Sequence, residues 1–361
     1  MAKPPWSAIH ARVHRELRGR SRLPQGTALL AAVSGGQDSV AMLKLLVDLQ
    51  PKWHWQLHVA HCNHRWRPDS ADNAAFVENL CRQWGIPCEV FIAEAVSKTE
   101  ADARQWRYAV LGDWARAQGY THIATGHTAT DRAETLLYNL LRGSGTDGLQ
   151  ALAWQRPLPL ADTGISLSDV RDCEDSSNRP NITLVRPLLA LTRQDTADFC
   201  QQFNLPIWLD TTNQDLSYAR NRLRLEVMPY LKQHFNPNVE STLAQTAEIL
   251  TAEVDWLAQM TQEIYQAAVE MDSTAQTWRL HRPTLTNVHL ALQRRVMRQV
   301  LQHATTTQIN FEHVEKLVSL IAAPNRTQTD PFPGGLTALV AAEWIVLRPD
   351  ASLLQEHDRE F

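Results

Sequence analysis

The stretch TALLAAVSGGQDSVAMLKLL, residues 27–46, decides the fold of this chain. Thr27 and the six apolar residues after it predict a buried strand, the glycines at positions 35 and 36 allow a tight turn, and the apolar period after Ser39 predicts a helix. Backbone amides converge with the positive end of the helix dipole in such a turn, and the hydroxyl groups of Ser34 and Ser39 add hydrogen-bond donors. The stretch therefore predicts a loop that binds phosphate.

Asp38 belongs to this loop, where a carboxylate would repel a polyphosphate unless a divalent cation lay between them. We therefore expect Asp38 to bind Mg²⁺ that also contacts phosphate oxygens. The sequence has no Gly-x-x-x-x-Gly-Lys-Ser/Thr motif, so a phosphate loop of the kinase or GTPase type is not supported. A glycine-rich turn without a ligand is the alternative interpretation of these residues.

The composition is that of a soluble globular protein, with 361 residues of which 44% are hydrophobic and 20% charged, and a formal net charge of -4. The sequence has no run of about 18 apolar residues and no apolar secretory core near its N-terminus, so we expect a cytoplasmic protein that does not contact a membrane. Its five cysteines include no Cys-x-x-Cys pair, which argues against disulfides, structural zinc and an iron–sulfur cluster.

Strand-like and helix-like segments alternate after the phosphate loop, which is typical of a Rossmann-like α/β fold with a doubly wound parallel sheet. The predicted strands cover residues 27–33, 56–60, 88–92 and 122–125, and the predicted helices cover 70–84 and 99–118 and begin again near Thr130. Ligands bind at the carboxyl ends of the strands in such sheets. The phosphate loop, residues 61–64 and residues 126–127 should therefore lie together.

The pattern changes along the chain, and it predicts two domains. Residues 1–230 form the α/β domain, in which residues 158–180 are rich in Asp, Ser, Asn and Pro and predict a long exposed acidic loop. Residues 231–361 form a smaller domain that we expect to be mainly helical. Its predicted elements are helices at 239–271 and 290–303 and strand-like segments at 335–340 and 344–347.

Polar side chains follow the second and fourth predicted strands. His61 and Asn63 come after the second strand, and we expect hydrogen-bonding roles for them, because histidines without a nearby thiolate make a poor zinc site. Asp131 and Glu134 are three residues apart on a predicted helix and so project from one face. They could bind a second metal ion or the ammonium group of an amino-acid substrate. A solvated acidic first turn that stabilises the helix is the alternative.

Arginines gather in several parts of the chain although its net charge is negative. Residues 1–25 contain six basic residues and one acidic residue. Arg220 and Arg224 are four residues apart on a predicted helix and could bind phosphates as a pair. Arg142 begins a glycine-rich segment that suits a loop against phosphate or RNA. Solvated helix faces and ordinary turns are the alternatives, so charge alone leaves RNA binding undecided.

These blocks, in this order, resemble the tRNA(Ile)-lysidine synthetase family, which belongs to the N-type ATP pyrophosphatases or PP-loop superfamily. The similarity covers about residues 25–230, and its motifs are specific as a set. They are Ser-Gly-Gly-x-Asp-Ser, His-x-Asn-His, Glu-x-x-Ala-Arg with Arg-Tyr, Gly-His with Asp-x-x-Glu-Thr, Arg-Gly-Ser-Gly, Arg-Pro-Leu-Leu, and Asp-x-Thr-Asn with Arg-Asn-x-Leu-Arg, at positions 34–39, 61–64, 100–108, 126–135, 142–145, 186–189 and 210–224. The second domain resembles the family's tRNA-binding region only loosely.

The resemblance implies an enzyme that adenylates the wobble cytidine of the CAU-anticodon tRNA(Ile) with ATP and then ligates L-lysine to C2 of that base. Lysidine forms, AMP and pyrophosphate are released, and decoding changes from AUG to AUA. The implied partners are tRNA(Ile), L-lysine, ATP and Mg²⁺. The sequence shows no obligate protein partner and leaves formation of a homodimer open.

The resemblance also implies roles for matching residues. ATP would be bound by Ser34, Gly35, Gly36, Gln37, Asp38, Ser39, His61 and Asn63. Asp38 would hold Mg²⁺ and act in catalysis together with His127 and Arg107. Asp131 and Glu134 would bind lysine, and the phosphate or tRNA contacts would come from Arg142, Arg220 and Arg224.

The chain departs from the family pattern at Thr130, where members often have a first acidic residue before Asp131, and in the length of its acidic loop. Because of Thr130, a second class of function is an alternative: a catalytically silent PP-loop protein that binds RNA. Another tRNA-modifying enzyme of the superfamily is a further alternative. Thiolases of that kind generally need paired cysteines or a cluster, and this chain has no Cys-x-x-Cys pair.

Overall fold

The computed structural model describes residues 6–19, 23–96, 99–158, 181–209 and 215–349. The chain divides into two compact units, Met1–Thr251 and Ala252–Phe361. The sequence analysis placed a boundary earlier, between residues 230 and 231. The difference arises because the 30-residue helix α10 (Val239–Ala268) continues from one unit into the other without a linker.

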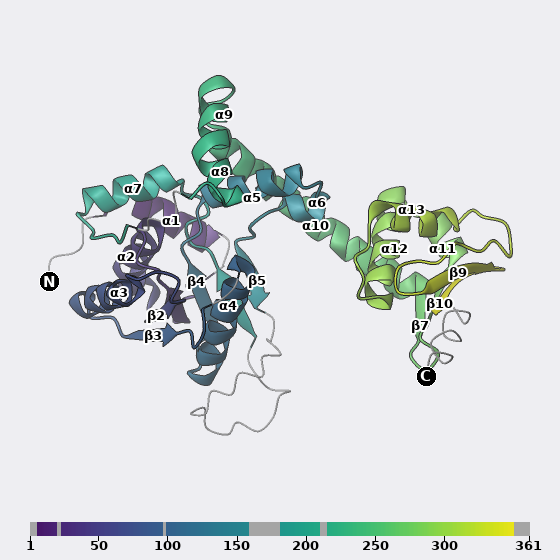
Figure 1. The fold of residues 1–361 in the computed structure, drawn as a ribbon, viewed down its shortest axis with the longest axis horizontal. Helices are drawn as coiled ribbons and strands as arrows, with labels where there is room; N and C mark the ends of the chain where they lie inside the picture. Colours follow the sequence, from purple (N-terminus) through teal and green to yellow (C-terminus); the bar gives the residue numbers. More distant parts are fainter. Residues whose placement is uncertain (1–5, 20–22, 97–98, 159–180, 210–214, 350–361) are drawn as a thin grey trace. The chain divides into compact units, whose positions relative to one another are not determined.

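The first unit contains a six-stranded sheet with the strand order β3-β2-β1-β4-β6-β5 (Figure 1). Its strands are β1 (Ala28–Ala32), β2 (Gln56–Asn63), β3 (Cys88–Ile92), β4 (His122–Thr125), β5 (Gln155–Leu158) and β6 (Ile182–Val185). All neighbouring strands are parallel except β5 and β6. The predicted doubly wound parallel sheet is confirmed, and all four predicted strands are present in it.

The sequence analysis did not predict β5 and β6. Each has only four residues, and β5 contains Arg156 and Pro157, so neither shows a clear strand-like alternation. Hydrogen bonding to neighbouring strands stabilises β5 and β6 instead. Strand β6 pairs in parallel with β4, and β5 pairs antiparallel with β6 at the edge of the sheet. The predicted acidic loop, residues 158–180, lies outside the described residues apart from Leu158, which ends β5.

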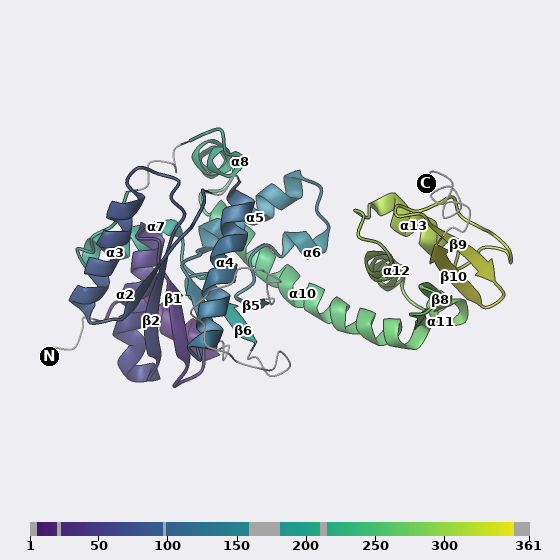
Figure 2. The same cartoon turned by 60° about the horizontal axis from the view of Figure 1, so that its bottom comes forward.

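Helices cover both faces of the sheet. Leu29 and Ala31 of β1 pack into a core with α1 (Ala8–Gly19), α2 (Gln37–Trp53), α3 (Ser70–Trp84) and α7 (Arg193–Gln202). Leu30 points to the opposite face, where α4 (Glu100–Ala117) packs. In Figure 2, strands β1 and β2 lie between α2 and α4.

Two capping boxes begin helices that contribute to this edge. The Thr128 and Asp131 side chains cap the first turn of α5 (Ala129–Leu141), and Thr192 and Asp195 do the same for α7. The short helix α6 (Thr146–Leu149) follows α5. After α7, the helix α8 (Ala219–Arg222), a π-helical turn η3 (Leu223–Val227) and α9 (Met228–His234) form one run. No helix in the described ranges has both the length and the apolar character needed to cross a bilayer.

The second unit combines helices with a four-stranded antiparallel sheet of order β7-β8-β10-β9. Its elements after α10 are β7 (Val269–Asp272), β8 (Thr277–His281), α11 (Arg282–Thr286), α12 (Leu290–Ala304), α13 (Phe311–Ser319), β9 (Leu336–Ala341) and β10 (Trp344–Pro349). The sequence pattern predicts α10, α12, β9 and β10, whereas β7 and β8 were expected as helix or not at all. Apolar side chains of α12 and β10, such as Val300 and Ile345, form its core.

Candidate active site at the carboxyl edge of the sheet

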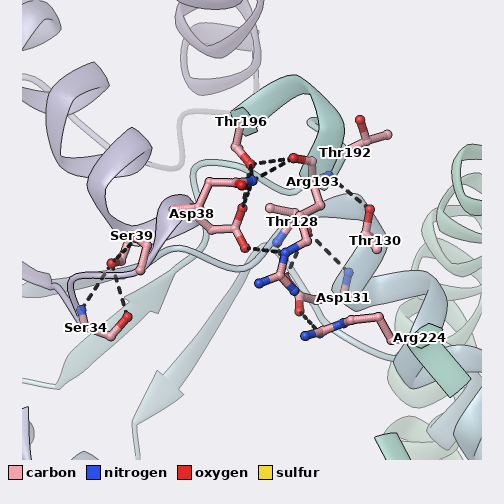
Figure 3. Close-up of polar contacts among 12 residues, drawn as sticks. Ser34, Asp38, Ser39, Thr128, Thr130, Asp131, Thr192, Arg193, Thr196 and Arg224 are labelled. Atoms are coloured by element: carbon pink, nitrogen blue, oxygen red, sulfur yellow. Dashed lines mark hydrogen bonds and ion pairs between the residues drawn. The ribbon is translucent and has the colours of Figure 1, made fainter. Parts of the chain in front are cut away.

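The phosphate loop, residues 34–39, joins β1 to α2 and is closed by side-chain hydrogen bonds (Figure 3). The Ser39 hydroxyl donates to the Gly36 carbonyl at 2.8 Å and accepts from the N–H and the hydroxyl of Ser34, each at 3.2 Å. In the described part of the chain, the amides of Gly35 and Gly36 donate no hydrogen bond. These amides are therefore available to an anion at the N-terminus of α2.

Two glycines let neighbouring elements approach this loop closely. Gly35 has a φ of +88°, and a Cβ atom there would lie 2.5 Å from Asn73 Oδ1 of α3. Gly126, directly after β4, lies on the other side of the loop, where a Cβ atom would lie 3.1 Å from the Asp38 carbonyl oxygen. A larger residue at Gly35 would be strained by the positive φ and would displace the Asn73 side chain, whereas one at Gly126 would press on the backbone of Asp38 and Ser39.

Asp38 lies in the first turn of α2 and contacts α7 (Figure 3). Its Oδ1 accepts a hydrogen bond from Thr196 Oγ1, and its Oδ2 lies 3.5 Å from Arg193 Nε. Burial raises the pKa of the Asp38 carboxyl, and Arg193 and Thr196 offset this effect only in part. The half-buried carboxylate at the cavity therefore fits a divalent cation.

The same surroundings favour a cation that is shared with the substrate. Among the described residues, no group of three or more His, Cys, Asp or Glu side chains could hold a metal by itself. Mg²⁺ is commonly held by one or two carboxylates together with substrate phosphates. Asp38 beside the phosphate loop matches that donor set.

Asp131 and Glu134 of α5 form a charged cluster with two arginines from α8 and η3. Arg220 donates to Asp131 Oδ1 at 3.1 Å and to Glu134 Oε2 at 3.3 Å. Arg224 donates to Glu134 through Nε at 2.7 Å and Nη2 at 2.8 Å, and its Nη2 lies 3.4 Å from Asp131 Oδ1. The sequence analysis assigned the carboxylates to lysine and the arginines to tRNA, whereas the structure joins all four side chains.

His127 and Asp131 lie together at the start of α5. Burial alone would raise the pKa of Asp131, but the Arg220 and Arg224 guanidiniums and a hydrogen bond from the Thr128 N–H at 2.8 Å lower it overall. Burial lowers the pKa of His127, whose Nδ1 hydrogen-bonds with Thr125 Oγ1 at 2.9 Å. An ionised carboxylate therefore lies beside a neutral imidazole at neutral pH.

Thr130, the position at which the family pattern often has an acidic residue, connects three helices. Its hydroxyl donates to Glu240 Oε2 of α10 at 3.0 Å and accepts from the Arg193 N–H of α7 at 3.0 Å. Thr130 is buried and does not line the cavity described next. Its contacts indicate a structural role in positioning Arg193.

A cavity of about 490 Å³ lies at the carboxyl edge of the sheet. The predicted site residues that line it are Ser34, Gly36, Gln37, Asp38, Ser39, His61, Asn63, Arg107, His127, Asp131, Arg220 and Arg224. Glu134 is fully buried and is not among the lining residues. Arg142 is exposed outside the cavity, with its guanidinium carbon 5.3 Å from the ring centroid of Tyr138. Gly35, also predicted to bind ATP, is a residue of the phosphate loop that does not line the cavity.

Several lining side chains also hold the site together. His61 Nδ1 lies 2.9 Å from the Val33 carbonyl oxygen, and Asn63 accepts from the Arg65 N–H at 2.9 Å. Gln37 Nε2 donates to the Arg193 carbonyl at 2.8 Å. These bonds fix the loops that follow β1 and β2, so His61, Asn63 and Gln37 position the cavity wall as well as lining it.

Comparison with known proteins assigns a family to this site and fold. A family model described as a PP-loop domain matches residues 9–231. A tRNA(Ile)-lysidine synthase from Nostoc sp. is 51% identical over 353 residues, which cover 95% of this chain and 97% of that protein. This chain belongs to the tRNA(Ile)-lysidine synthase family. A synthase of that name from Synechocystis sp. is 48% identical, with 91% of this chain and 94% of the relative covered.

Family membership extends over the second unit, because the similarity to these synthases covers nearly the whole chain. A chloroplastic tRNA(Ile)-lysidine synthase from Zygnema circumcarinatum is 36% identical, covering 80% of this chain and 74% of that protein. Among solved structures, the U34-tRNA thiolase NcsA from Methanococcus maripaludis has a TM-score of 0.51 and 15% identity, with 67% of this chain and 77% of that chain covered. That likeness shows a shared fold.

The sequence analysis missed several residues of this synthase-family site, three of which lie on α7 or just after it. Arg193 and Trp208 line the cavity, and Thr196 donates to Asp38. Helix α7 follows β6, a strand that was not predicted. The spacing of Thr192 and Asp195 marks the start of a helix, and this signal would have placed Arg193 and Thr196 in its first turn.

His64 makes this synthase-family site sensitive to acid. It lines the cavity, its ring contacts Trp66 and Trp106, and within the described residues its buried Nδ1 has no hydrogen-bond partner. Burial lowers the pKa of His64 from 6.5 to about 4. The fold favours the neutral imidazole, so this contribution to stability is complete above pH 6.5 and is lost as the pH falls toward 4.

Acid lowers the free energy of unfolding of the wild-type protein, and we expect His64→Phe, which retains the aromatic contacts, to reduce this loss by about 1–2 kcal/mol. The value is smaller than for a fully buried imidazole, because water partly screens the charge on His64. Denaturant unfolding at pH 4.5 and 7.5 measures the difference. His54→Asn is the matched control, because His54 is exposed and asparagine tolerates its positive φ of 54°. The same acid dependence in wild type and His64→Phe would contradict the assignment.

Proposed function

We propose that this chain ligates L-lysine to C2 of the wobble cytidine of tRNA(Ile) with the anticodon CAU, and so forms lysidine. One observation carries the proposal: a single cavity is lined by the phosphate loop, by Asp38 and by the charged cluster at Asp131. The name shared by the relatives supports the same activity. Because the reaction consumes tRNA and ATP, we place it in the cytoplasm.

The first step joins AMP to the cytidine. The phosphates of ATP would lie against the amides of Gly35 and Gly36, and the C2 oxygen of the base would attack the α-phosphate and release pyrophosphate. Mg²⁺ held by Asp38 would neutralise charge on the phosphates. Arg107 lines the cavity from α4 and would stabilise the negative charge that develops at the α-phosphate. Positioning and fixed charges would supply most of the rate enhancement.

In the second step, a lysine amine attacks C2 and AMP leaves. Asp131 is the carboxylate of the cluster that lines the cavity, so we assign it to the ammonium group of lysine that does not react. Glu134 lies behind it, holds Arg220 and Arg224, and supports the lysine site from there. Neutral His127 lines the cavity beside Asp131 and would accept a hydrogen bond from the attacking amine, whose proton passes to solvent.

Incubation with labelled lysine, ATP, Mg²⁺ and a panel of tRNA transcripts tests the proposal. We expect ATP-dependent label in tRNA(Ile) with the CAU anticodon and one pyrophosphate per lysine incorporated. The same tRNA with uridine at the wobble position is the matched control and should remain unlabelled. Pyrophosphate release without label would refute lysine transfer. Binding of tRNA with neither product would instead favour a catalytically silent RNA-binding protein.

A further inference from the structure

Three guanidinium groups surround the ring of Tyr108 on α4. Their Cζ atoms lie 5.2 to 5.3 Å from the ring centroid and belong to Arg104, Arg107 and Arg156. The Tyr108 ring is 8% exposed and packs in the core between α4 and the sheet. A fixed aromatic face of this kind attracts cations and restricts the rotamers that the arginines adopt.

As far as the structure describes the chain, the guanidiniums of this cluster lack close carboxylate partners, although Glu100 and Asp131 line the same cavity. A fourth guanidinium, that of Arg186, which is 2% exposed, lies near enough to lower the pKa of the Tyr108 hydroxyl through its positive charge. None of the four forms an ion pair with a carboxylate in the ranges that the structure describes. Burial and the neighbouring arginines lower the pKa of Arg104. Like charges held this closely favour binding of an anion.

The cluster lies across the cavity from the phosphate loop. The loop leads into α2 on one face of the sheet, whereas α4 packs on the other face. Arg104 and Arg107 both line the cavity. Helix α4 runs antiparallel to the strands, so Arg104, nearer its N-terminus, lies farther out from the sheet edge than Arg107. The backbone of Arg104 therefore lies about one helical turn farther out than that of Arg107.

We propose that Arg104 binds a backbone phosphate of the tRNA beside the target cytidine, and that Tyr108 is a positioning residue that holds Arg104 for this contact and Arg107 for the reacting phosphate. The inference rests on the proposed function for the identity of the RNA. The phosphates of ATP already have the loop amides on the opposite wall. A single-stranded nucleotide entering the cavity brings its own phosphodiester past the outer arginine, where a guanidinium binds it well.

Binding measurements without ATP or lysine test this contact. For Arg104→Gln, we expect the dissociation constant of unmodified tRNA(Ile) to rise about tenfold. The slope of log affinity against log salt concentration should become shallower by about 0.7, as for one lost phosphate contact on single-stranded RNA. The dissociation constant of ATP should stay within about twofold of wild type. Arg82→Gln removes an exposed guanidinium on α3 outside the cavity and is the matched control.

Substitution of the ring tests the positioning role. Tyr108→Leu should weaken tRNA binding as Arg104→Gln does and should also lower kcat, because Arg107 loses its support. Tyr108→Phe retains the ring and should restore both. Failure of this rescue would overturn the positioning role of the ring.

Two further outcomes would overturn the RNA contact. Weaker ATP binding by Arg104→Gln with unchanged tRNA binding would assign the arginine to the nucleotide. Unchanged affinity for both ligands would leave the cluster a purely structural one. Wild-type protein that incorporates no lysine, while Arg104→Gln still weakens tRNA binding, would overturn the proposed function and support the contact.

Discussion

Asp38→Asn is expected to lower the rate of cytidine adenylation at least about 10²- to 10³-fold, with unchanged folding and tRNA binding. Asparagine keeps the shape of the side chain and can still accept a hydrogen bond from Thr196, but it removes the negative charge that would hold Mg²⁺ beside the phosphates. Transfer of label from α-³²P ATP to tRNA(Ile) in a single turnover, measured across a range of Mg²⁺ concentrations, gives the effect.

The comparison with Asp198→Asn makes this result specific. Asp198 is an exposed carboxylate on α7 outside the cavity, and its loss should leave both adenylation and the dependence on Mg²⁺ unaltered. Turnover by Asp38→Asn at the wild-type rate, with the same Mg²⁺ dependence, would remove the metal role from Asp38.

Glu134→Gln is expected to lower the free energy of unfolding by about 1–3 kcal/mol, because it removes the buried one of the two carboxylates that neutralise Arg220 and Arg224, while Asp131 and solvent still screen both guanidiniums. Glu134 is fully buried and is bonded to Arg220 and Arg224, whose side chains are 35% and 18% exposed. Denaturant unfolding of the single variant, of Arg224→Gln and of the double variant measures the effect. The double variant should lose less than the sum of the single variants, since it removes both charges of one pair.

Asp131→Asn separates the lysine role from this structural role. Asp131 lines the cavity, so its loss should raise the KM for lysine and slow lysine transfer far more than it slows adenylation. Equal loss of both steps would argue against a lysine site at Asp131. A fully stable Glu134→Gln variant would show that the cluster is less tightly coupled than its distances indicate.

The sequence predicted the strands that have both an apolar local pattern and a regular spacing along the chain. The strands at 27–33, 56–60, 88–92 and 122–125 have apolar cores and follow one another at βαβ spacing, so the parallel sheet could be predicted without coordinates. The strands β5 and β6 could not, because four residues carry too little periodicity and pairing with β4 supplies their stability.

For the candidate site, the sequence identified most of the residues and could not identify their partners. Asp131 and Arg220 are separated by 89 positions, and no local pattern shows that their side chains meet. Arg193 and Thr196 were missed, since they reach Asp38 only because α7 packs beside α2. Contacts between distant segments depend on packing, which periodicity does not encode.

Residues 27–125 by themselves predict the phosphate loop and the succession of strands along the chain. This is possible because backbone turns, helix starts and apolar periods depend on residues that are close in sequence. Which carboxylate faces the cavity and which is buried behind it was decided only in three dimensions. Asp131 and Glu134 share one helix face, yet two arginines about 90 positions away enclose the second more fully than the first. Burial and charge compensation are properties of the packed molecule, and they separate two residues that the sequence presents as equivalent.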